Sequence, residues 1–244
     1  MTGSISRKIS LQGTGTFSSG TDNEIRRIRL IHEAHSPSQA DIWLVEWQGR
    51  ECVLRDYSKP RHFYWRFICR WAVRREIKAH QLLDGIDGIP RLLKVINRDS
   101  YLIEYIQGSS LHFRKHQPTG EFFDKLGWIV GQMHSHQVAH GDFRNKNILV
   151  GPDDSPYVID FTTAWWGTTW WRKPLFRFFC RLDDRRLAVS RAHFLPEQFT
   201  EEELDRIATG PFYIRIGKFY RKKIYPLFAP SASKKAQKRA NRNR

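Results

Sequence analysis

One stretch of the sequence holds the residue types that a phosphoryl-transfer site requires. It runs from His140 to Asn147 as His-Gly-Asp-Phe-Arg-Asn-Lys-Asn, and a second carboxylate, Asp160, follows 18 residues after Asp142. Asp142 can accept the proton of an attacking hydroxyl, and Arg144 can neutralise charge on the transferred phosphoryl group. Asn147 and Asp160 can hold Mg²⁺ through side-chain oxygens, the ligands that this ion prefers. The stretch therefore predicts a site for phosphoryl transfer.

The spacing of these residues is similar to that of a known catalytic loop. The pattern H-x-D-x-x-x-x-N, followed by the apolar run Ile148–Val150 and by Asp160-Phe161, resembles the catalytic and metal-binding loops of the protein-kinase-like superfamily. A glycine rather than an arginine before Asp142 looks more like the small-molecule and atypical branch of that superfamily. This branch includes aminoglycoside and choline phosphotransferases, RIO-type kinases and the lipopolysaccharide core (Kdo) kinases. The alternative is a loop and hairpin whose polar residues are incidental.

The resemblance covers about residues 24–190 and implies an α+β fold with two lobes. The small lobe is expected to be an antiparallel β-sheet with one main helix, and the large lobe is expected to be mostly helical. We predict a mobile N-terminal arm, a nucleotide-binding small lobe, a catalytic large lobe and a disordered basic tail, over residues 1–23, 24–107, 108–230 and 231–244 respectively.

Two charged residues of the small lobe are predicted to serve the nucleotide. Runs rich in β-branched and aromatic residues predict strands over Ile25–His32, Ile42–Trp47 and Glu51–Tyr57. Arg55 lies where the third strand of a kinase carries its phosphate-pairing lysine, so the resemblance gives it a contact to the nucleotide phosphates. Arginine keeps the charge but has a different reach. Its natural partner is Glu76, on a helix predicted around residues 74–83. The alternatives are that Arg55 is a surface cation on an edge strand and that Glu76 forms a surface ion pair.

Two other segments bear on nucleotide binding. The turn Glu33–Ser38 is expected to cover the nucleotide although it has no glycine, whereas the glycine-rich run Gly13–Gly20 does not fit a phosphate-binding pattern. A strand predicted over Ser100–Ile106 leads into the connection between the lobes. The resemblance places the adenine contacts there, through backbone groups around Glu104 to Ile106.

The large lobe is predicted to contain three helices. Apolar residues recur at helical spacing over Glu121–His136, which indicates a buried helix that supports the catalytic loop. Further helices are predicted over Asp183–Ala192 and from Thr200 to Ala208, the last beginning with a capping box. We interpret His140 as a structural residue that braces the loop through its ring nitrogens.

The charge of the chain predicts an anionic partner. Lysine and arginine number 41 against 25 acidic residues, a net charge of +16, so nucleic acid, anionic lipid and phosphorylated glycan all qualify. Cations interrupt aromatic runs over residues 63–71, 165–181 and 214–227. Such segments suit a membrane interface, and the alternatives are packing in the core or stacking on nucleic-acid bases. The basic tail suits nucleic acid.

The sequence contains no run of roughly 18 apolar residues that would predict a membrane span. Its N-terminus has no apolar core of the kind that a signal peptide requires. Cys52, Cys69 and Cys180 lie far apart without metal-ligand spacing, which favours a reducing compartment. We therefore expect a cytoplasmic protein that is either soluble or peripheral on the cytoplasmic face of the bacterial inner membrane.

With a short region after Asp160 and several basic aromatic stretches, the chain is most similar to the Kdo kinase group. That resemblance implies transfer of the γ-phosphoryl group of ATP, with Mg²⁺, to a sugar hydroxyl of the lipopolysaccharide core, a lipid-linked glycan. One alternative is a RIO-like Ser/Thr protein kinase that acts on a protein hydroxyl. Another is a pseudokinase that binds without catalysing, which would account for Arg55. The sequence leaves the acceptor and the oligomeric state open.

Overall fold

The computed structural model describes residues 24–34, 39–59, 63–167 and 169–209. Described residues up to Leu187 form one compact unit and those from Ala188 form a second, and each unit is described by itself. The predicted lobe boundary at residue 107 lies inside the first unit and stays a prediction. Four predicted features lie outside the described residues: the N-terminal arm, part of the turn at 35–38, the basic aromatic stretch at 214–227 and the tail.

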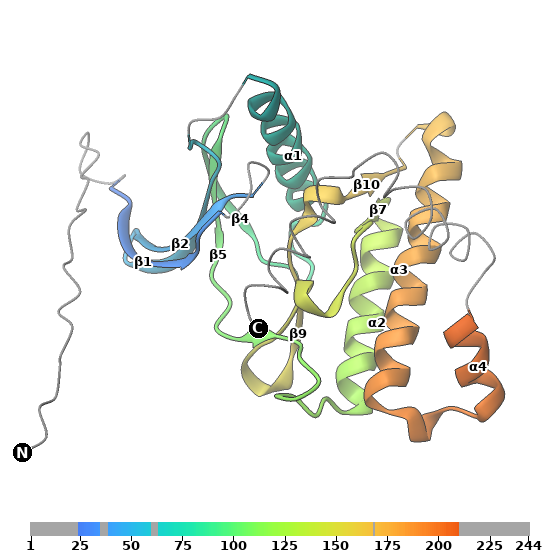
Figure 1. Cartoon of the computed structure of the whole chain (residues 1–244). Helices are drawn as coiled ribbons and strands as arrows, with labels where there is room; N and C mark the ends of the chain where they lie inside the picture. Colours follow the sequence, from blue (N-terminus) through green and yellow to red (C-terminus); the bar gives the residue numbers. More distant parts are fainter. Residues whose placement is uncertain (1–23, 35–38, 60–62, 168, 210–244) are drawn as a thin grey trace, which may run out of the picture. The chain divides into compact units, whose positions relative to one another are not determined.

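The small lobe is a five-stranded antiparallel sheet (Figure 1). Its strand order is β1 (Arg26–His32), β2 (Asp41–Trp47), β3 (Arg50–Asp56), β5 (Ser100–Glu104) and β4 (Leu92–Asn97). Gln48 and Gly49 both have positive φ, 51° and 71°, which is the backbone of a tight two-residue hairpin turn between β2 and β3. The three strands predicted for this part of the chain are confirmed.

The main helix of the small lobe is α1 (Phe63–Leu82), which begins eleven residues before the predicted segment at 74–83. The earlier start includes the basic aromatic run at 63–71, so that this run is the first half of the helix and not a separate surface segment. Its aromatic side chains are exposed at three positions, Phe63, Phe67 and Trp71, while Cys69 is buried. The run is therefore amphipathic and has one face in the core.

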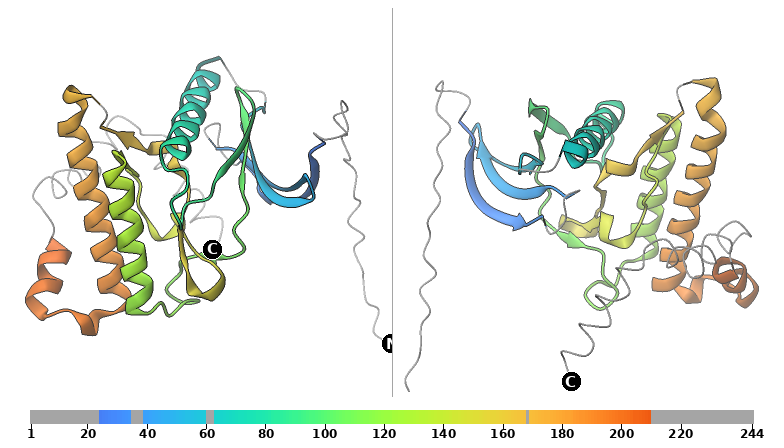
Figure 2. Two further views of the ribbon diagram at one scale, coloured as in Figure 1. Left: turned by 180° about the vertical axis from the view of Figure 1, so that it is seen from behind. Right: turned by 45° about the horizontal axis from the view of Figure 1, so that its top comes forward.

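The helical part of the first unit contains α2 (Gly120–Ser135) and the beginning of α3 (Lys173–Phe194), which run side by side in both views (Figures 1 and 2). Thr119 caps α2 because its hydroxyl oxygen accepts from the N–H of Phe122 at 3.3 Å. The predicted apolar stripe of α2 is confirmed as buried core: Phe122, Phe123, Leu126, Ile129, Val130 and Met133.

The predicted start of α3 at Asp183 is wrong, since the helix begins at Lys173. Pro174 is compatible with a first helical turn, where its missing N–H costs nothing. Phe176 and Asp183 are both buried and stand seven residues apart, which places them on one face of the helix. The basic aromatic stretch at 165–181 thus divides into a short strand and the first turns of a helix.

Short elements surround the predicted catalytic loop. A three-stranded sheet has the order β6 (Ser109–Ser110), β8 (Ile148–Val150) and β9 (Pro156–Val158), and β7 (Val138–Ala139) pairs with β10 (Trp165–Trp166). Single 3₁₀ turns cover 145–147, 152–154, 161–163 and 170–172. The hairpin predicted between Asn147 and Asp160 is confirmed, although β9 ends at Val158 because Asp160 adopts a left-handed conformation with φ of 69°.

The second unit contains a 3₁₀ turn at Pro196–Gln198 and α4 (Glu201–Thr209). The N–H of Glu203 donates to the Thr200 hydroxyl at 3.3 Å, and the N–H of Thr200 donates to the Glu203 carboxylate at 2.9 Å. This is the predicted capping box. Among the described helices, none combines the length and apolarity needed to cross a bilayer.

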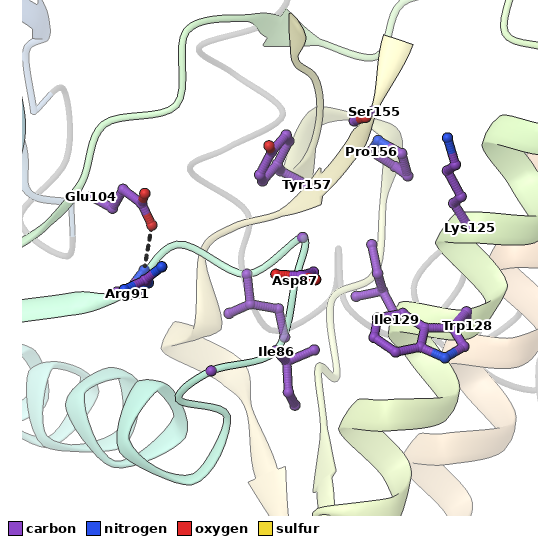
Figure 3. Close-up of a pocket in the computed structure, with 13 residues that line it drawn as sticks. Ile86, Asp87, Arg91, Glu104, Lys125, Trp128, Ile129, Ser155, Pro156 and Tyr157 are labelled. Atoms are coloured by element: carbon purple, nitrogen blue, oxygen red, sulfur yellow. Dashed lines mark hydrogen bonds between the residues drawn. The ribbon is translucent and has the colours of Figure 1, made fainter. Parts of the chain in front are cut away.

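A cavity of about 400 Å³ opens in the first unit where the connection after α1 meets β5, α2 and the start of β9 (Figure 3). Trp128 and Ile129 of α2 line it opposite Tyr157 and the segment from Gly85 to Ile89. Of the residues predicted to form the catalytic site, only Glu104 lines this cavity. The cavity is therefore separate from the proton acceptor and the metal ligands.

Candidate active site

The catalytic loop makes a sharp turn at Gly141, which only glycine tolerates. Its φ is +75°, and a Cβ atom at this position would lie 2.7 Å from the carbonyl oxygen of Thr163. A side chain would therefore meet both an unfavourable backbone conformation and a backbone clash. The close approach lets the Thr163 hydroxyl donate to the carbonyl oxygen of His140 at 3.1 Å. The glycine before Asp142 thus has a local structural cause.

His140 braces the loop through both ring nitrogens, as predicted. The N–H of Asp142 donates to its Nδ1 at 3.3 Å, so Nε2 carries the proton and donates to the carbonyl oxygen of Ile159 at 2.9 Å. The ring is fully buried and packs against Phe161, with centroids 5.1 Å apart. One neutral imidazole therefore joins the loop that carries Asp142 to the segment that carries Asp160.

Asp183 also holds this loop, a role that the sequence analysis missed. Its carboxylate accepts from the N–H of His140 at 2.6 Å and from the N–H of Gly141 at 3.1 Å, and it is only 1% exposed. A buried carboxylate is tolerated where hydrogen bonds replace its hydration. Asp183 lies on the same buried face of α3 as Phe176, and a helix predicted to begin at Asp183 gave no sign of this position.

The predicted proton acceptor, Asp142, lies at the edge of the loop with its side chain 30% exposed. The Arg144 guanidinium pairs with its Oδ2, and the Lys146 ammonium lies 4.0 Å from the same atom. Arg144 is about half exposed, so it can leave this pair when a phosphoryl group offers more negative charge. The structure thus brings Asp142 and Arg144 together, two residues that were predicted to act in the same site.

A backbone hydrogen bond at the end of the hairpin holds Asn147 beside Ile159, the residue before Asp160. The N–H of Ile159 donates to the carbonyl oxygen of Asn147 at 2.9 Å. The Asn147 side-chain amide donates to the carbonyl oxygen of Asp142 at 2.9 Å, which leaves its Oδ1 as the atom that can bind a cation. Asn147 and Asp160 both offer hard oxygen ligands, so this pair fits Mg²⁺, which in phosphoryl-transfer sites takes one or two protein ligands together with phosphates and water.

The described residues contain no cluster of three or more His, Cys, Asp or Glu side chains able to hold a metal ion. A site made of one carboxylate and one amide is smaller than such a cluster. It depends on the nucleotide phosphates for the remaining ligands.

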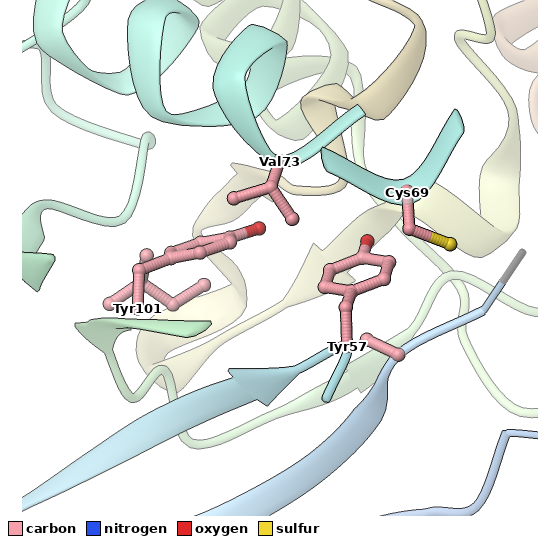
Figure 4. Close-up of a cluster of buried hydrophobic side chains, with 6 residues drawn as sticks. Tyr57, Cys69, Val73 and Tyr101 are labelled. Atoms are coloured by element: carbon pink, nitrogen blue, oxygen red, sulfur yellow. The ribbon is translucent and has the colours of Figure 1, made fainter. Parts of the chain in front are cut away.

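A buried cluster fixes α1 against the sheet (Figure 4) and thereby positions Glu76. Tyr57, Tyr101 and Ile103 on the sheet side pack with Cys69 and Val73 of α1. Residues three apart on a helix share a face, so Glu76 follows Val73 toward the sheet.

Arg55, Glu76 and Asp160 form a connected group of charges. Arg55 Nη1 pairs with Glu76 Oε1, and Arg55 Nη2 lies 3.4 Å from Asp160 Oδ1. Arg55 is 9% exposed and Glu76 is fully buried, so both surface alternatives considered for them are wrong. The predicted pair of Arg55 and Glu76 is confirmed. The second terminal nitrogen of the Arg55 guanidinium, Nη2, joins this pair to Asp160, the predicted metal ligand.

The pKa values of this group follow from burial and pairing. Burial raises the pKa of the Glu76 carboxyl to about 7, although the Arg55 guanidinium opposes that rise. Burial alone would raise the pKa of Asp160, but the Arg55 guanidinium and the Thr162 hydroxyl lower it below its ordinary value. Asp160 therefore stays ionised, which is the state that a metal ligand requires.

Glu104 and Ile106 lie at the end of β5 and just beyond it. The N–H of Glu104 donates to the carbonyl oxygen of Arg91 at 2.9 Å, and its carboxylate accepts from the N–H of Arg91 at 3.2 Å (Figure 3). An adenine contact by Glu104 would therefore use its carbonyl oxygen. The contacts predicted for Glu104 and Ile106 stay predictions.

Comparison with known proteins agrees with this geometry. Residues 100–201 match the model of the Lipopolysaccharide kinase (Kdo/WaaP) family, a range that includes Asp142, Asn147, Asp160 and Asp183. The Rio2 kinase–ADP/Mg²⁺–phosphoaspartate complex from Chaetomium thermophilum superposes with a TM-score of 0.50 at 18% identity, over 68% of this chain and 56% of that one. This chain has a protein-kinase-like fold. The predicted two-lobed α+β fold and the resemblance to the Kdo kinase group, with RIO-type kinases next, are confirmed.

Two relatives are similar in sequence to parts of this chain. A probable bifunctional tRNA threonylcarbamoyladenosine biosynthesis protein from Methanosphaera stadtmanae is 27% identical over 131 residues, which is 51% of this chain. The serine/threonine-protein kinase RIO2 of Caenorhabditis elegans is 28% identical over 110 residues, which is 44% of this chain. The chain spans only 24% and 21% of the length of these two proteins.

The first prediction concerns Asp183. We expect Asp183→Asn to lower the free energy of unfolding by about 1.5–3 kcal/mol, because hydrogen bonds to a charged acceptor are lost from a buried site. Amide exchange at His140 and Gly141 should accelerate. Denaturant unfolding and hydrogen exchange measure the two effects. Asp184→Asn is the control, because the side chain of this adjacent residue is 62% exposed. Equal losses in the two variants would contradict the role given to Asp183.

The second prediction concerns the pH dependence of stability. Burial alone would lower the pKa of His134, but hydrogen bonds with Asp183 and Cys180 raise it to about 9, against an ordinary value near 6.5. The folded state then holds a proton that the unfolded state releases, so the stabilisation is complete below pH 6.5 and is lost as the pH rises to about 9. It amounts to roughly 3 kcal/mol.

We expect His134→Gln to remove this decline between pH 6.5 and 9, measured as the free energy of unfolding in urea at each pH. The matched control is His136→Gln, since His136 is exposed at the C-terminal end of α2. A decline that persists unchanged in His134→Gln would show that another group causes it.

Proposed function

We propose that this chain is an ATP- and Mg²⁺-dependent phosphotransferase that acts on a hydroxyl group. The observation that supports this most is the joining of two sets of residues from distant parts of the chain. Arg55 and Glu76 of the small lobe meet Asp160, which follows the hairpin after the Asp142 loop, with 3.4 Å between Arg55 Nη2 and Asp160 Oδ1. Phosphoryl transfer depends mainly on such positioning and on charge stabilisation.

Each residue has one task in this mechanism. Asp142 accepts the proton of the attacking hydroxyl, and Arg144 moves from Asp142 to the transferred phosphoryl group as negative charge develops there. Arg55 contacts the nucleotide phosphates while Glu76 holds its guanidinium in place. Asp160 and Asn147 would hold Mg²⁺, which would supply positive charge to neutralise the nucleotide phosphates. His140 and Asp183 keep the loop in position.

We propose a sugar hydroxyl of the lipopolysaccharide core as the acceptor. The match of residues 100–201 to the lipopolysaccharide kinase family supports this choice. A second candidate, a protein hydroxyl, is favoured by the similarity to the serine/threonine-protein kinase RIO2 over 110 residues. The catalytic residues serve either acceptor, because both present an alcohol to Asp142.

We also propose that the protein works on an anionic membrane surface at the cytoplasmic face. Phe63 and Phe67 at the start of α1 and Trp170 at the 3₁₀ turn are 89%, 69% and 82% exposed. Exposed rings beside arginine suit the boundary of lipid headgroups. The net charge of +16 would add electrostatic attraction to anionic lipid. Nucleic acid is the competing partner for the same charge.

The third prediction separates the proton acceptor from the metal ligand. We expect Asp142→Asn to lower the rate of phosphoryl transfer by roughly 10²–10⁴-fold, because the base is lost, while nucleotide binding stays nearly unchanged. Asp160→Asn should instead weaken the binding of Mg²⁺ and ATP. Transfer is measured with labelled ATP and binding by calorimetry, with Asp153→Asn as control because this residue lies exposed on the hairpin turn. A rate for Asp142→Asn near that of the unmodified protein would exclude Asp142 as the base.

The fourth prediction concerns the acceptor. The purified protein is incubated with labelled ATP and Mg²⁺, and lipid-linked core glycan and a protein extract are offered side by side. We expect label in the glycan and its absence with Asp142→Asn. Label found only in protein would favour a RIO-like kinase. If neither acceptor is labelled, the result would favour a protein that binds nucleotide without catalysing transfer.

A further inference from the structure

A small cavity of about 160 Å³ lies where α1 meets β10 and the 3₁₀ turn at 170–172. Five side chains line it, three tryptophans and two arginines: Trp71, Arg75, Trp165, Trp166 and Arg172. We call this set the Trp–Arg cage. It shares no residue with the catalytic site described above, although Arg75 directly precedes Glu76 in α1.

The cage holds two positive charges without an acidic residue in its lining. Arg75 is only 8% exposed. Burial lowers the pKa of its guanidinium, and the nearby Arg172 guanidinium lowers it further. Two buried or half-buried like charges repel each other, and burial removes the water that would screen them. An anion between them would remove both costs.

Unused hydrogen-bond donors in the cage also indicate a site for an anion. One nitrogen of Arg75, Nη2, donates to the carbonyl oxygen of Ala164 and lies 3.4 Å from that of Thr163. Among the described residues, three buried N–H groups of the cage have no acceptor: Nε of Arg75, Nε of Arg172 and Nε1 of Trp165. A buried donor without an acceptor is destabilising and rare in folded proteins, so three from one cavity lining are unusual.

Contacts with the rings explain only part of this arrangement. The Arg75 guanidinium lies 4.2 Å from the ring centre of Trp71, and Arg172 lies 4.7 Å from that of Trp171. Such cation–π contacts stabilise the charges over the ring faces. They do not supply acceptors to N–H groups that lie in the planes of the guanidinium and indole. A purely structural stack therefore leaves the donors unexplained.

We propose that the Trp–Arg cage binds the phosphate group of a phosphate monoester. Guanidinium groups match phosphate oxygens in geometry and charge, and an indole N–H adds a further donor. The cavity holds a group of this size, whereas sites for whole small molecules usually measure roughly 300–1,000 Å³. The phosphate can belong to a sugar, to a lipid headgroup or to free phosphate.

Binding at the cage would also act on α1. Arg75 and Glu76 are neighbours in this helix, and Arg75 contacts the carbonyl oxygens of Thr163 and Ala164, three and four residues after Asp160. An anion that joins Arg75 to Arg172 would therefore hold the helix that carries Glu76 against the segment that follows the metal ligand.

The fifth prediction tests the cage by binding alone, without reference to catalysis. Inorganic phosphate is titrated into the full-length, nucleotide-free protein at constant ionic strength, and tryptophan fluorescence and the melting temperature are recorded. We expect saturable changes in both, with sodium chloride as the reference. Arg172→Gln should weaken the apparent affinity by about 10-fold or more, since a charge-assisted hydrogen bond is lost. Arg177→Gln, an equal charge change at an exposed position of α3, should leave it unchanged.

A second variant removes a hydrogen-bond donor of the cage without changing its charge. Trp165→Phe keeps an aromatic ring beside Arg75 but removes the unused indole N–H, and it should also weaken phosphate binding, whereas Trp170→Phe, at an 82% exposed position, should not. Arg144→Gln tests whether the phosphate instead binds beside Asp142. Phosphate binding that is lost in Arg144→Gln but kept in Arg172→Gln and Trp165→Phe would overturn the proposal. If phosphate and chloride produced the same response in the unmodified protein, the proposal would also be overturned.

The source of the phosphate is then determined with two probes. Glucose 6-phosphate represents a phosphorylated sugar, and vesicles containing phosphatidic acid, compared with phosphatidylcholine alone, represent a lipid headgroup. We expect one of them to compete with inorganic phosphate, and the competition should disappear in Arg172→Gln. Competition that is equal in Arg172→Gln and in the unmodified protein would place the phosphate elsewhere. Because none of these measurements requires phosphoryl transfer, a negative result here leaves the proposed activity untouched.

Discussion

The buried carboxylate of Asp183 is the interaction on which the catalytic loop depends. It accepts two consecutive backbone N–H groups, those of His140 and Gly141, in a place where water cannot replace them. The loop can turn this tightly only because residue 141 is glycine, and His140 then ties the loop to Ile159. The position of the loop that carries Asp142 therefore depends on buried contacts made by other residues.

Arg55 on one side, and Arg75 with Arg172 on the other, have different surroundings in this fold. Arg55 has carboxylate partners in Glu76 and Asp160, so its charge is balanced within the protein. Arg75 and Arg172 have aromatic rings and backbone oxygens around them, and their cavity lining contains no carboxylate. Since an unbalanced buried charge is costly, the first group suits a fixed catalytic scaffold and the second suits a site completed by a ligand.

The helix α1 links these two groups. One face packs through Cys69 and Val73 on the sheet, and this packing carries Glu76 to Arg55. Arg75, the preceding residue, reaches the backbone after Asp160 instead. Consecutive residues of a helix point about 100° apart, so one helix can serve both the nucleotide side and the cage.

The sequence by itself predicted the candidate site residues and the order of the elements. The loop from His140 to Asn147, the hairpin to Asp160 and the buried stripe of α2 are local patterns, and spacing alone predicts them. The pair of Arg55 and Glu76 was predicted from the resemblance to kinases, in which a strand and a helix carry the corresponding residues. What only the tertiary structure decided was which distant residues complete the site. Asp183 was missed because its two bonds reach back 42 and 43 residues, and the cage gathers residues from positions 71 to 172. Such contacts depend on how α1, α3 and β10 pack in three dimensions, and local sequence patterns do not encode that packing.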